Sequence, residues 1–203
     1  MAQANIYQCT RQCDHKSVKD ASDSELMRQV RGGRTAALAT LFERHHARLY
    51  RYALRMTGNR AAAEDLVQDV FMKMLKYKAT FKDDSEFVPW MFGIGRNACL
   101  AHLRRTADDR FADGDVDSAA RPEDAAEDQR HDGQDELVRR ALQRLPADRR
   151  EVLVLSRYEY KTYDEIAKTL ECSVGAVKVR AHRAMKQLRE IYLDMAGERE
   201  VPT

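Results

Sequence analysis

The chain has 203 residues, 43% of them hydrophobic, which is enough to build packed cores in one domain or two small ones. It contains no run of eighteen apolar residues, and its N-terminus "MAQANIYQCTRQCDH" lacks the apolar core of a secretory signal, so we expect no membrane insertion and a cytoplasmic location. The formal net charge is only +2 although 33% of residues are charged, so the distribution of the two signs is more informative than their sum.

Residues 1–22 are expected to form a flexible N-terminal extension. Its segment "CTRQCDH" places Cys9, Cys13 and His15 close together, and these side chains could ligate zinc or respond to oxidation. Three candidate ligands on a mobile tail do not make a closed site, so incidental cysteines are the simpler interpretation, and neither a metal nor a cofactor is predicted. The other two cysteines, Cys99 and Cys172, fall in helical patterns, and we expect them to be reduced, buried thiols.

The next part of the chain has helical periodicity throughout. Apolar residues recur at helical spacing, and no segment alternates with period two for long enough to predict a strand. Glycines in "RGG" and "TGN" and polar residues in "FKDDS" mark the ends of successive helices. We therefore predict an all-α first domain over residues 23–106, with helices at Asp23–Arg31, Thr35–Met56, Ala61–Tyr77 and Phe87–Arg105.

The composition changes abruptly after this domain. The stretch from Asp108 to Glu136 contains twelve acidic residues and three arginines, which gives it a charge of minus nine. It has almost no large apolar side chains whose burial could offset the entropy lost on folding. Residues 107–134 are therefore predicted to form an acidic, flexible linker.

Helical periodicity returns in residues 135–195, which we predict to be a second all-α domain followed by a tail, residues 196–203. The segment "TYDEIAKTLECSVGAVKVRAHRA" has the form of a helix-turn-helix, with a short helix at Tyr163–Leu170, a tight turn from Glu171 and a longer helix from Val174. Glu171 stands at a turn position where glycine is common, so we expect either local backbone strain or an altered turn there.

The longer helix of this motif carries a basic face. Its stretch "CSVGAVKVRAHRAMKQLRE" has five Lys or Arg residues against one acid. A solvated surface explains an average basic helix, but in a helix-turn-helix this helix enters the major groove of DNA, so contacts with phosphates and base edges are the better interpretation. The candidate DNA-reading residues are Lys178, Val179, Arg180, His182 and Arg183.

The segment "AAAEDLVQDVFMKMLKYKATFKDDSEFVPWMFGIGRNACLAHLRR" resembles region two of bacterial sigma factors, and the helix-turn-helix domain resembles region four. Together they resemble the extracytoplasmic-function group, which has only these two regions. The resemblance implies an alternative sigma factor, not an enzyme, that binds core RNA polymerase, recognises the minus-ten and minus-thirty-five promoter elements and assists promoter melting. Two alternatives stay open: a helix-turn-helix regulator that binds duplex DNA without joining polymerase, and a protein-interaction module that has lost DNA binding.

Within this segment, "AEDLVQDVF" predicts an acidic ridge opposite an apolar inner stripe. The acidic ridge consists of Glu64, Asp65, Gln68 and Asp69. The resemblance implies that it docks on the coiled-coil clamp of the polymerase β′ subunit, that the second domain meets the β flap, and that an anti-sigma factor is a further partner. For Glu64 and Asp65 the alternative is a solvated first turn favoured by the helix dipole.

An aromatic-rich segment, "FKDDSEFVPWMF", follows the acidic ridge. Single aromatic residues of this kind are more often core. The resemblance implies that the loop captures a base flipped from the non-template strand of the minus-ten element, which offsets part of the unstacking energy. It also assigns the basic face to the minus-thirty-five element and the acidic linker to the polymerase interior near the RNA exit path. The minus-ten residues are Phe81, Lys82, Asp83, Asp84, Ser85, Trp90, Arg96 and Asn97.

Overall fold

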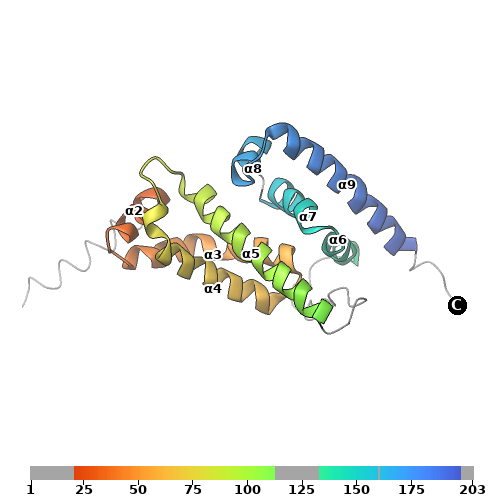
Figure 1. Ribbon diagram of the computed structural model, residues 1–203, viewed down its shortest axis with the longest axis horizontal. Coiled ribbons are helices and arrows are strands. Elements are labelled where there is room, and N and C mark those ends of the chain that lie inside the picture. The colour runs from red at the N-terminus through yellow and green to blue at the C-terminus, as the bar shows by residue number, and fades with distance from the viewer. Residues whose placement is uncertain (1–20, 113–132, 160, 198–203) are drawn as a thin grey trace, which may run out of the picture.

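The computed structural model describes residues 21–112, 133–159 and 161–197, and every regular element in these ranges is a helix (Figure 1). The all-α prediction is confirmed. The predictions for the N-terminal extension, for most of the acidic linker and for residues 198–203 concern positions outside these ranges, and so do Cys9, Cys13 and His15. The elements are α2 (Asp23–Arg31), α3 (Ala36–Thr57), α4 (Arg60–Lys76), the 3₁₀ turn η1 (Lys78–Thr80), α5 (Phe87–Ala112), α6 (Gly133–Gln143), α7 (Ala147–Leu153), the π-helical turn η2 (Val154–Tyr158), α8 (Tyr163–Thr169) and α9 (Val174–Gly197).

The sequence signals locate the helices of the first domain closely. Helix α2 has the predicted bounds, and α3 and α4 are each displaced by one residue at both ends. The sequence predicts an end of α5 at Arg105, but the helix continues to Ala112, so residues 107–112 are helical and not part of a flexible linker. No glycine or proline occurs there before Gly114, and alanine and arginine favour helix, so nothing local stops α5 at Arg105.

Capping residues at the helix ends explain why the sequence predicts the helix boundaries well. The Asn59 side chain accepts a hydrogen bond of 2.9 Å from the Ala62 amide at the start of α4. Thr162 and Glu165 form a reciprocal capping box at the start of α8. Gly58 ends α3 with φ 72°, a left-handed conformation that glycine adopts without steric cost.

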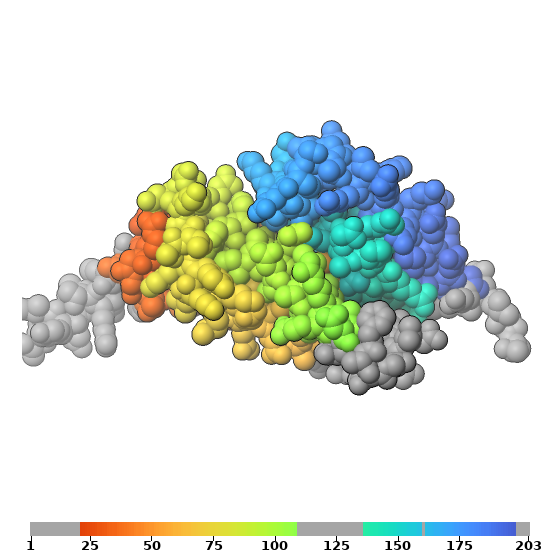
Figure 2. All heavy atoms as spheres, in the orientation of Figure 1, coloured from red at the N-terminus to blue at the C-terminus, as the bar shows by residue number. Residues whose placement is uncertain are grey.

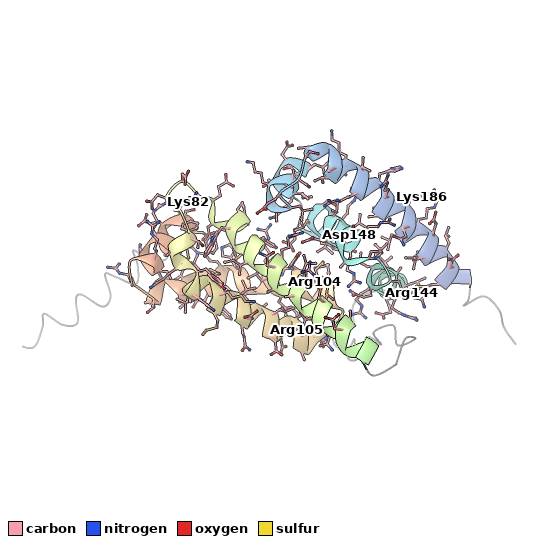
Figure 3. The ribbon with its side chains drawn as sticks, viewed as in Figure 1. Lys82, Arg104, Arg105, Arg144, Asp148 and Lys186 are labelled. Carbon is pink, nitrogen blue, oxygen red and sulfur yellow. The ribbon has the colours of Figure 1, made fainter. Side chains whose placement is uncertain are left out.

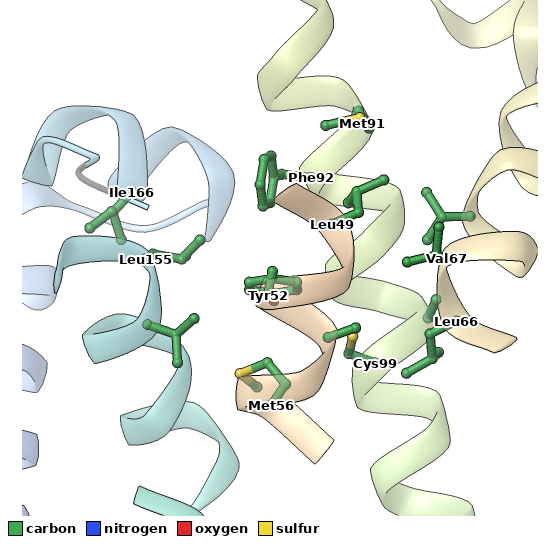
Figure 4. Packing of buried hydrophobic residues seen from close by; sticks show 14 of the residues in the cluster. Leu49, Tyr52, Met56, Leu66, Val67, Met91, Phe92, Cys99, Leu155 and Ile166 are labelled. Carbon is green, nitrogen blue, oxygen red and sulfur yellow. The ribbon is translucent and has the colours of Figure 1, made fainter. Parts of the chain in front are cut away.

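The first domain is formed by α3, α4 and α5, with α2 covering one end (Figure 1). Leu49 of α3, Leu66 and Val67 of α4 and Cys99 of α5 are almost fully buried among these helices (Figure 4). Gly95 of α5 is buried against these helices, and a Cβ atom there would make an ordinary contact of 3.4 Å with Leu49 Cδ2. The apolar stripes of the helices thus meet in one core.

The second domain packs α6, α7 and α8 along the long helix α9 (Figure 1). Ile166 of α8 and Val177 and Ala181 of α9 are buried where the two helices of the helix-turn-helix cross. In the turn between these helices Glu171 has φ 50°, which confirms the expected backbone strain.

The two domains share one hydrophobic core. Tyr52 of α3 and Phe92 of α5 belong to the same buried cluster as Leu155 and Ile166 of the second domain, and the two pairs face each other in Figure 4. Figure 2 shows the atoms of the second domain pressed directly against those of α5. The sequence does not predict this contact, because periodicity identifies the apolar face of a helix but not the neighbour that covers it.

Candidate functional site

Helix α4 presents the acidic ridge to solvent. Glu64, Asp65 and Gln68 are exposed, whereas Asp69 is half-buried. The Asp69 carboxylate accepts a hydrogen bond of 2.6 Å from Lys73 Nζ, one turn further along the helix. This ion pair offsets part of the charge of the acidic ridge, so its negative potential is greatest at Glu64 and Asp65. The inner stripe is buried as predicted: Leu66, Val67, Val70, Phe71 and Met74.

The loop between α4 and α5 is built on an aromatic cluster. Phe81 is fully buried, with its ring centroid 5.2 Å from that of Trp90 and 6.4 Å from that of Phe87. The resemblance places Phe81 among the minus-ten residues, but a ring without exposed surface cannot stack on a base in this conformation. The rest of the loop lies further out, with Lys82 at its tip (Figure 3), and comprises the exposed Lys82, Asp83 and Asp84 and the half-buried Ser85.

Helix α2 holds this loop in position, a role that the sequence does not predict. Arg31 Nη1 donates a hydrogen bond of 2.7 Å to the Phe81 carbonyl, and Arg31 also forms an ion pair with the Asp83 carboxylate. Arg28 Nη1 lies 3.4 Å from the Asp83 carbonyl, to which it donates. These contacts tie the backbone of the loop to α2.

The other minus-ten candidates lie along α5. Trp90 is half-buried, and its Nε1 donates a hydrogen bond of 3.3 Å to Thr80 Oγ1. Asn97 is exposed, but its neighbour Arg96 turns toward the second domain, where its Nε lies 3.0 Å from Glu151 Oε1. Of these two adjacent polar residues, only Asn97 points freely into solvent.

Further along α5, Arg104 and Arg105 are exposed and extend the positive charge of the helix (Figure 3). Burial and the neighbouring Arg105 lower the pKa of His102. This histidine is therefore neutral at pH 7 and supplies hydrogen-bonding groups without charge.

Helix α9 presents the predicted basic face. Lys178, His182 and Arg183 are exposed, and Val179 is 50% exposed. Arg180 is half-buried and lies to one side of this face. The opposite stripe of α9, including Val177, Ala181 and Ala184, is buried as the sequence predicts.

A pocket of about 270 Å³ opens beside the basic face. Its lining includes Arg157, Lys178, Ser156 and Tyr163, residue types that carry hydrogen-bond donors of the kind that binds a phosphate group. The sequence analysis missed Arg157 and Tyr163, although a basic residue just before the helix-turn-helix and an aromatic residue at the start of its first helix were a usable signal. The complete lining is Leu153, Ser156, Arg157, Tyr163, Lys178, Ala181, His182 and Met185.

Both cysteines of the described ranges are free thiols. Burial raises the pKa of Cys99 to about 12, so this thiol stays protonated and unreactive. Cys172 is half-buried and lies in the turn between α8 and α9, where the predicted helix-turn-helix places it. In the same ranges no three His, Cys, Asp or Glu side chains are grouped so that they could hold a metal ion. No described helix combines the length and the apolar character needed to cross a membrane.

Family models match both domains. Sigma-70 region 2 matches residues 41–108, and Sigma-70, region 4 matches residues 135–188. The first range contains the acidic ridge and the loop between α4 and α5, and the second contains the helix-turn-helix with its basic face. The candidate surfaces thus lie inside the matched ranges.

Curated proteins are similar over most of the chain. RNA polymerase sigma factor CarQ of Myxococcus xanthus is 34% identical over 168 residues, which cover 81% of this chain and 94% of CarQ. ECF RNA polymerase sigma factor SigL of Mycobacterium tuberculosis is 34% identical over 156 residues, which cover 76% of this chain and 88% of SigL.

Solved structures have the same fold. CnrH in complex with the cytosolic domain of CnrY has a TM-score of 0.63 and 27% identity, and the match covers 85% of this chain and 97% of CnrH. The sigma factor RpoE of Bartonella quintana, in complex with the anti-sigma factor NepR, has a TM-score of 0.62 and 29% identity, and the match covers 75% of this chain and 94% of RpoE. Fold, sequence and the two family regions agree, and the chain belongs to the extracytoplasmic-function family of RNA polymerase sigma factors.

Proposed function

We propose that the chain joins core RNA polymerase through its first domain and directs it to promoters that both domains read. It acts in the cytoplasm and catalyses no reaction itself. The observation that carries this proposal is the presence of two exposed surfaces of opposite sign on separate domains, the acidic ridge of α4 and the basic face of α9. The first suits a basic protein surface, and the second suits DNA.

The acidic ridge is the proposed contact with the coiled-coil clamp of β′, and the β flap is the proposed partner of the second domain. Asp65 and Gln68 are exposed and need no rearrangement, whereas Asp69 shares its carboxylate with Lys73. Met72, one turn beyond Gln68, is 65% exposed. An apolar side chain beside a polar rim is the arrangement that a protein interface buries at its centre.

The loop between α4 and α5 is the proposed reader of the minus-ten element. Lys82, Asp83 and Asp84 offer exposed hydrogen-bonding groups to the edge of a base flipped out of the duplex. Trp90, half-buried beside the loop, offers an aromatic surface, and Asn97 continues the polar path along α5. In this arrangement Phe81 and α2 support the loop without touching DNA.

The basic face of α9 is the proposed reader of the minus-thirty-five element. Lys178, His182 and Arg183 reach base edges in the major groove. The adjoining pocket receives a phosphate of the DNA backbone, held by Arg157 and the Tyr163 hydroxyl. In this arrangement the side chains of α9 determine which DNA sequence is bound, and the phosphate in the pocket fixes the orientation of the second domain on the DNA.

An anti-sigma factor is a further proposed partner. RpoE of Bartonella quintana was solved with the anti-sigma factor NepR, and CnrH with the cytosolic domain of CnrY. A protein of this kind would act on the present chain by covering the acidic ridge, the basic face or both.

Reconstituted transcription tests the proposal. The purified chain and core RNA polymerase free of other sigma factors are incubated with a genomic promoter library, and the initiated transcripts are sequenced. We expect transcripts that begin downstream of a shared pair of sequence elements. A regulator that binds duplex DNA without joining polymerase would bind the library and initiate nothing, and a module without DNA binding would do neither.

A further inference from the structure

The contact between the two domains contains two buried carboxylates. Glu151 of α7 is 2% exposed, and it accepts hydrogen bonds from the Tyr52 hydroxyl at 3.1 Å and from Arg96 Nε at 3.2 Å. The Glu159 side chain is 3% exposed and accepts a hydrogen bond of 2.6 Å from Arg48 Nε. Both acids belong to the second domain, and these donors belong to the first.

An aromatic ring lies at the centre of the same contact. Phe92 of α5 is 1% exposed, with the guanidinium carbon of Arg48 5.1 Å from its ring centroid. Lys161 of the second domain places its ammonium nitrogen 4.2 Å from that centroid. A cation over an aromatic face is attracted more strongly when water is excluded. The two domains thus contribute one cation each to the environment of Phe92.

Side chains of the second domain donate hydrogen bonds to the C-terminal end of α3. The last carbonyls of a helix have no partner within it. Gln143 Nε2 donates a hydrogen bond of 2.7 Å to the Arg55 carbonyl, and Arg150 Nη1 donates to the Met56 carbonyl and to Gln143 Oε1. At Gly58 a Cβ atom would lie 2.9 Å from Gln143 Cδ, so the backbone turn and the second domain fit closely.

Many of these contacts are polar, in addition to the apolar cluster that the two domains share. Buried ion pairs add little net stability, because the cost of desolvation offsets their attraction, but they favour one geometry. Water can solvate the same groups when the domains separate. Contacts between domains with this composition resemble transient protein interfaces and permit relative motion.

The docked arrangement engages a residue that the proposed function requires for DNA. Arg96, a minus-ten candidate, is held by the buried Glu151 carboxylate, with its Nε 3.0 Å from Oε1. Burial raises the pKa of the Glu151 carboxyl, while the charge of Arg96 lowers it. A candidate DNA contact of the first domain is therefore directed toward the interior.

We infer that the α3–α5 face of the first domain is a docking surface for the second domain of the same chain, and that minus-ten DNA competes with the second domain for one residue of this face, Arg96. This docking face consists of Arg48, Tyr52, Phe92 and Arg96. In the free chain the second domain occupies the docking face, and DNA gains Arg96 only after that domain leaves. The competition rests on the proposed minus-ten role of α5, whereas the docking does not.

A charge-exchange experiment tests the docking, using two residues that have no proposed contact with DNA or polymerase. Full-length chains carrying Arg48→Glu, Glu159→Arg or both are compared by small-angle scattering. We expect each single variant to have a larger radius of gyration than the wild type, because like charges then face each other across the contact. The double variant restores an ion pair of opposite polarity and should return to the wild-type radius.

Matched variants separate this effect from a change in net charge. Arg51→Glu makes the same charge change on an exposed position of α3, and Asp148→Arg makes the same change on an exposed position of α7. Both should keep the wild-type radius. Circular dichroism checks that each variant is folded, and Glu159→Gln, which keeps the side-chain shape, replaces Glu159→Arg if the latter unfolds.

Binding of the free chains to a labelled single strand then tests the competition. The probe is the non-template strand of a promoter recovered in the transcription experiment. Glu159→Arg should bind it at least about threefold more tightly than Asp148→Arg, because a larger fraction of the chain is open, and the double variant should return to the wild-type affinity. Radii unchanged by both single variants would overturn the docking, and equal affinities despite larger radii would overturn the competition. Failure of the wild type to initiate transcription would instead overturn the proposed function.

Discussion

The Tyr52 hydroxyl donates a hydrogen bond of 3.1 Å to the Glu151 carboxylate and so joins α3 of the first domain to α7 of the second inside the protein. Burial is the largest of the causes that raise the pKa of Tyr52 well above its usual value. The hydroxyl therefore stays protonated, and able to donate, at neutral and mildly alkaline pH. This bond offers a direct measure of how strongly the domains are coupled.

Replacing Tyr52 by Phe should weaken that coupling. The ring stays in its edge-to-face contact with Phe92, 5.4 Å away, but Glu151 loses a donor. We expect the free energy of unfolding, measured in urea, to fall by about 1–2 kcal/mol. Tyr50→Phe, at a half-buried position of the same helix, is the control and should have a smaller effect. Equal effects of the two changes would contradict the importance of the bond.

Lys161 gives the stability of the protein a dependence on alkaline pH. Burial lowers its pKa from 10.5 to about 8, so between these values the unfolded chain binds more protons than the folded one and stability rises with pH. Lys161→Met keeps the stem packed near Phe92 and removes the buried charge. We expect the variant to gain about 1 kcal/mol at pH 7 and to lose the rise between pH 8 and 10.5 in urea titrations. If the stability of Lys161→Met still rises between pH 8 and 10.5, another titrating group is responsible for the pH dependence.

Reversing the charge of the acidic ridge should prevent binding to core polymerase. In the double variant Asp65→Lys, Asp69→Lys, positive charges face a basic partner, and the ion pair of Asp69 with Lys73 is lost at a cost of about 0.5 kcal/mol. We expect an unchanged helical circular dichroism signal and no co-elution with core polymerase. Glu43→Lys, an exposed reversal on α3, is the matched control and should bind normally. Normal binding by the double variant would show that polymerase meets another surface.

The basic face and its pocket should respond differently to truncation. Lys178→Ala or Arg183→Ala removes a proposed base contact and should cost about 1–3 kcal/mol at one promoter position while relaxing preference there. Arg157→Ala should weaken binding to all DNA sequences alike, because a phosphate contact carries no sequence information. It should also lower the slope of the logarithm of the binding constant against the logarithm of the salt concentration by about one. Lys186→Ala, exposed further along α9, is the control. These effects are measured by binding duplex promoter DNA over a range of salt; a sequence-selective effect of Arg157→Ala would refute its proposed role.

The strained turn of the helix-turn-helix should be open to improvement. Glu171 is exposed and has φ 50°, so glycine would remove a steric cost that exceeds its own entropic penalty. We expect Glu171→Gly to raise the free energy of unfolding by about 0.5–1 kcal/mol. Glu190→Gly within α9 should lower it by about 1 kcal/mol, because glycine is unfavourable inside a helix. If both changes lower stability, the backbone at Glu171 is not strained.

The features that the sequence predicts well are local ones. The strain at Glu171 and the start of α8 at Tyr163 are both set by neighbouring residues. The turn position predicts the first, and the capping box of Thr162 and Glu165 explains why the predicted start of the helix is right. The exposure of Lys178 and Arg183 follows from the helical period, which also predicts the buried stripe of α9.

The features that the sequence does not predict depend on distant partners. Arg96 turns inward because Glu151, 55 residues later, supplies a buried carboxylate. Phe81 is buried because Trp90 and Phe87 fold over it, although its sequence context is equally typical of an exposed loop. Arg157 borders a pocket only because α9 returns beside it. Periodicity contains no information on such pairings.

The last turn of α3 depends on donors that lie far along the chain, since Gln143 is 88 residues beyond Arg55. When the domains separate, water must take the place of Gln143 and Arg150, and the last turn of the helix frays more often. Backbone amides of that turn would then exchange with deuterium faster, whereas those of its middle would not. The final turn of α3 is therefore an intrinsic reporter of opening, readable by hydrogen exchange in the unlabelled, unmodified protein.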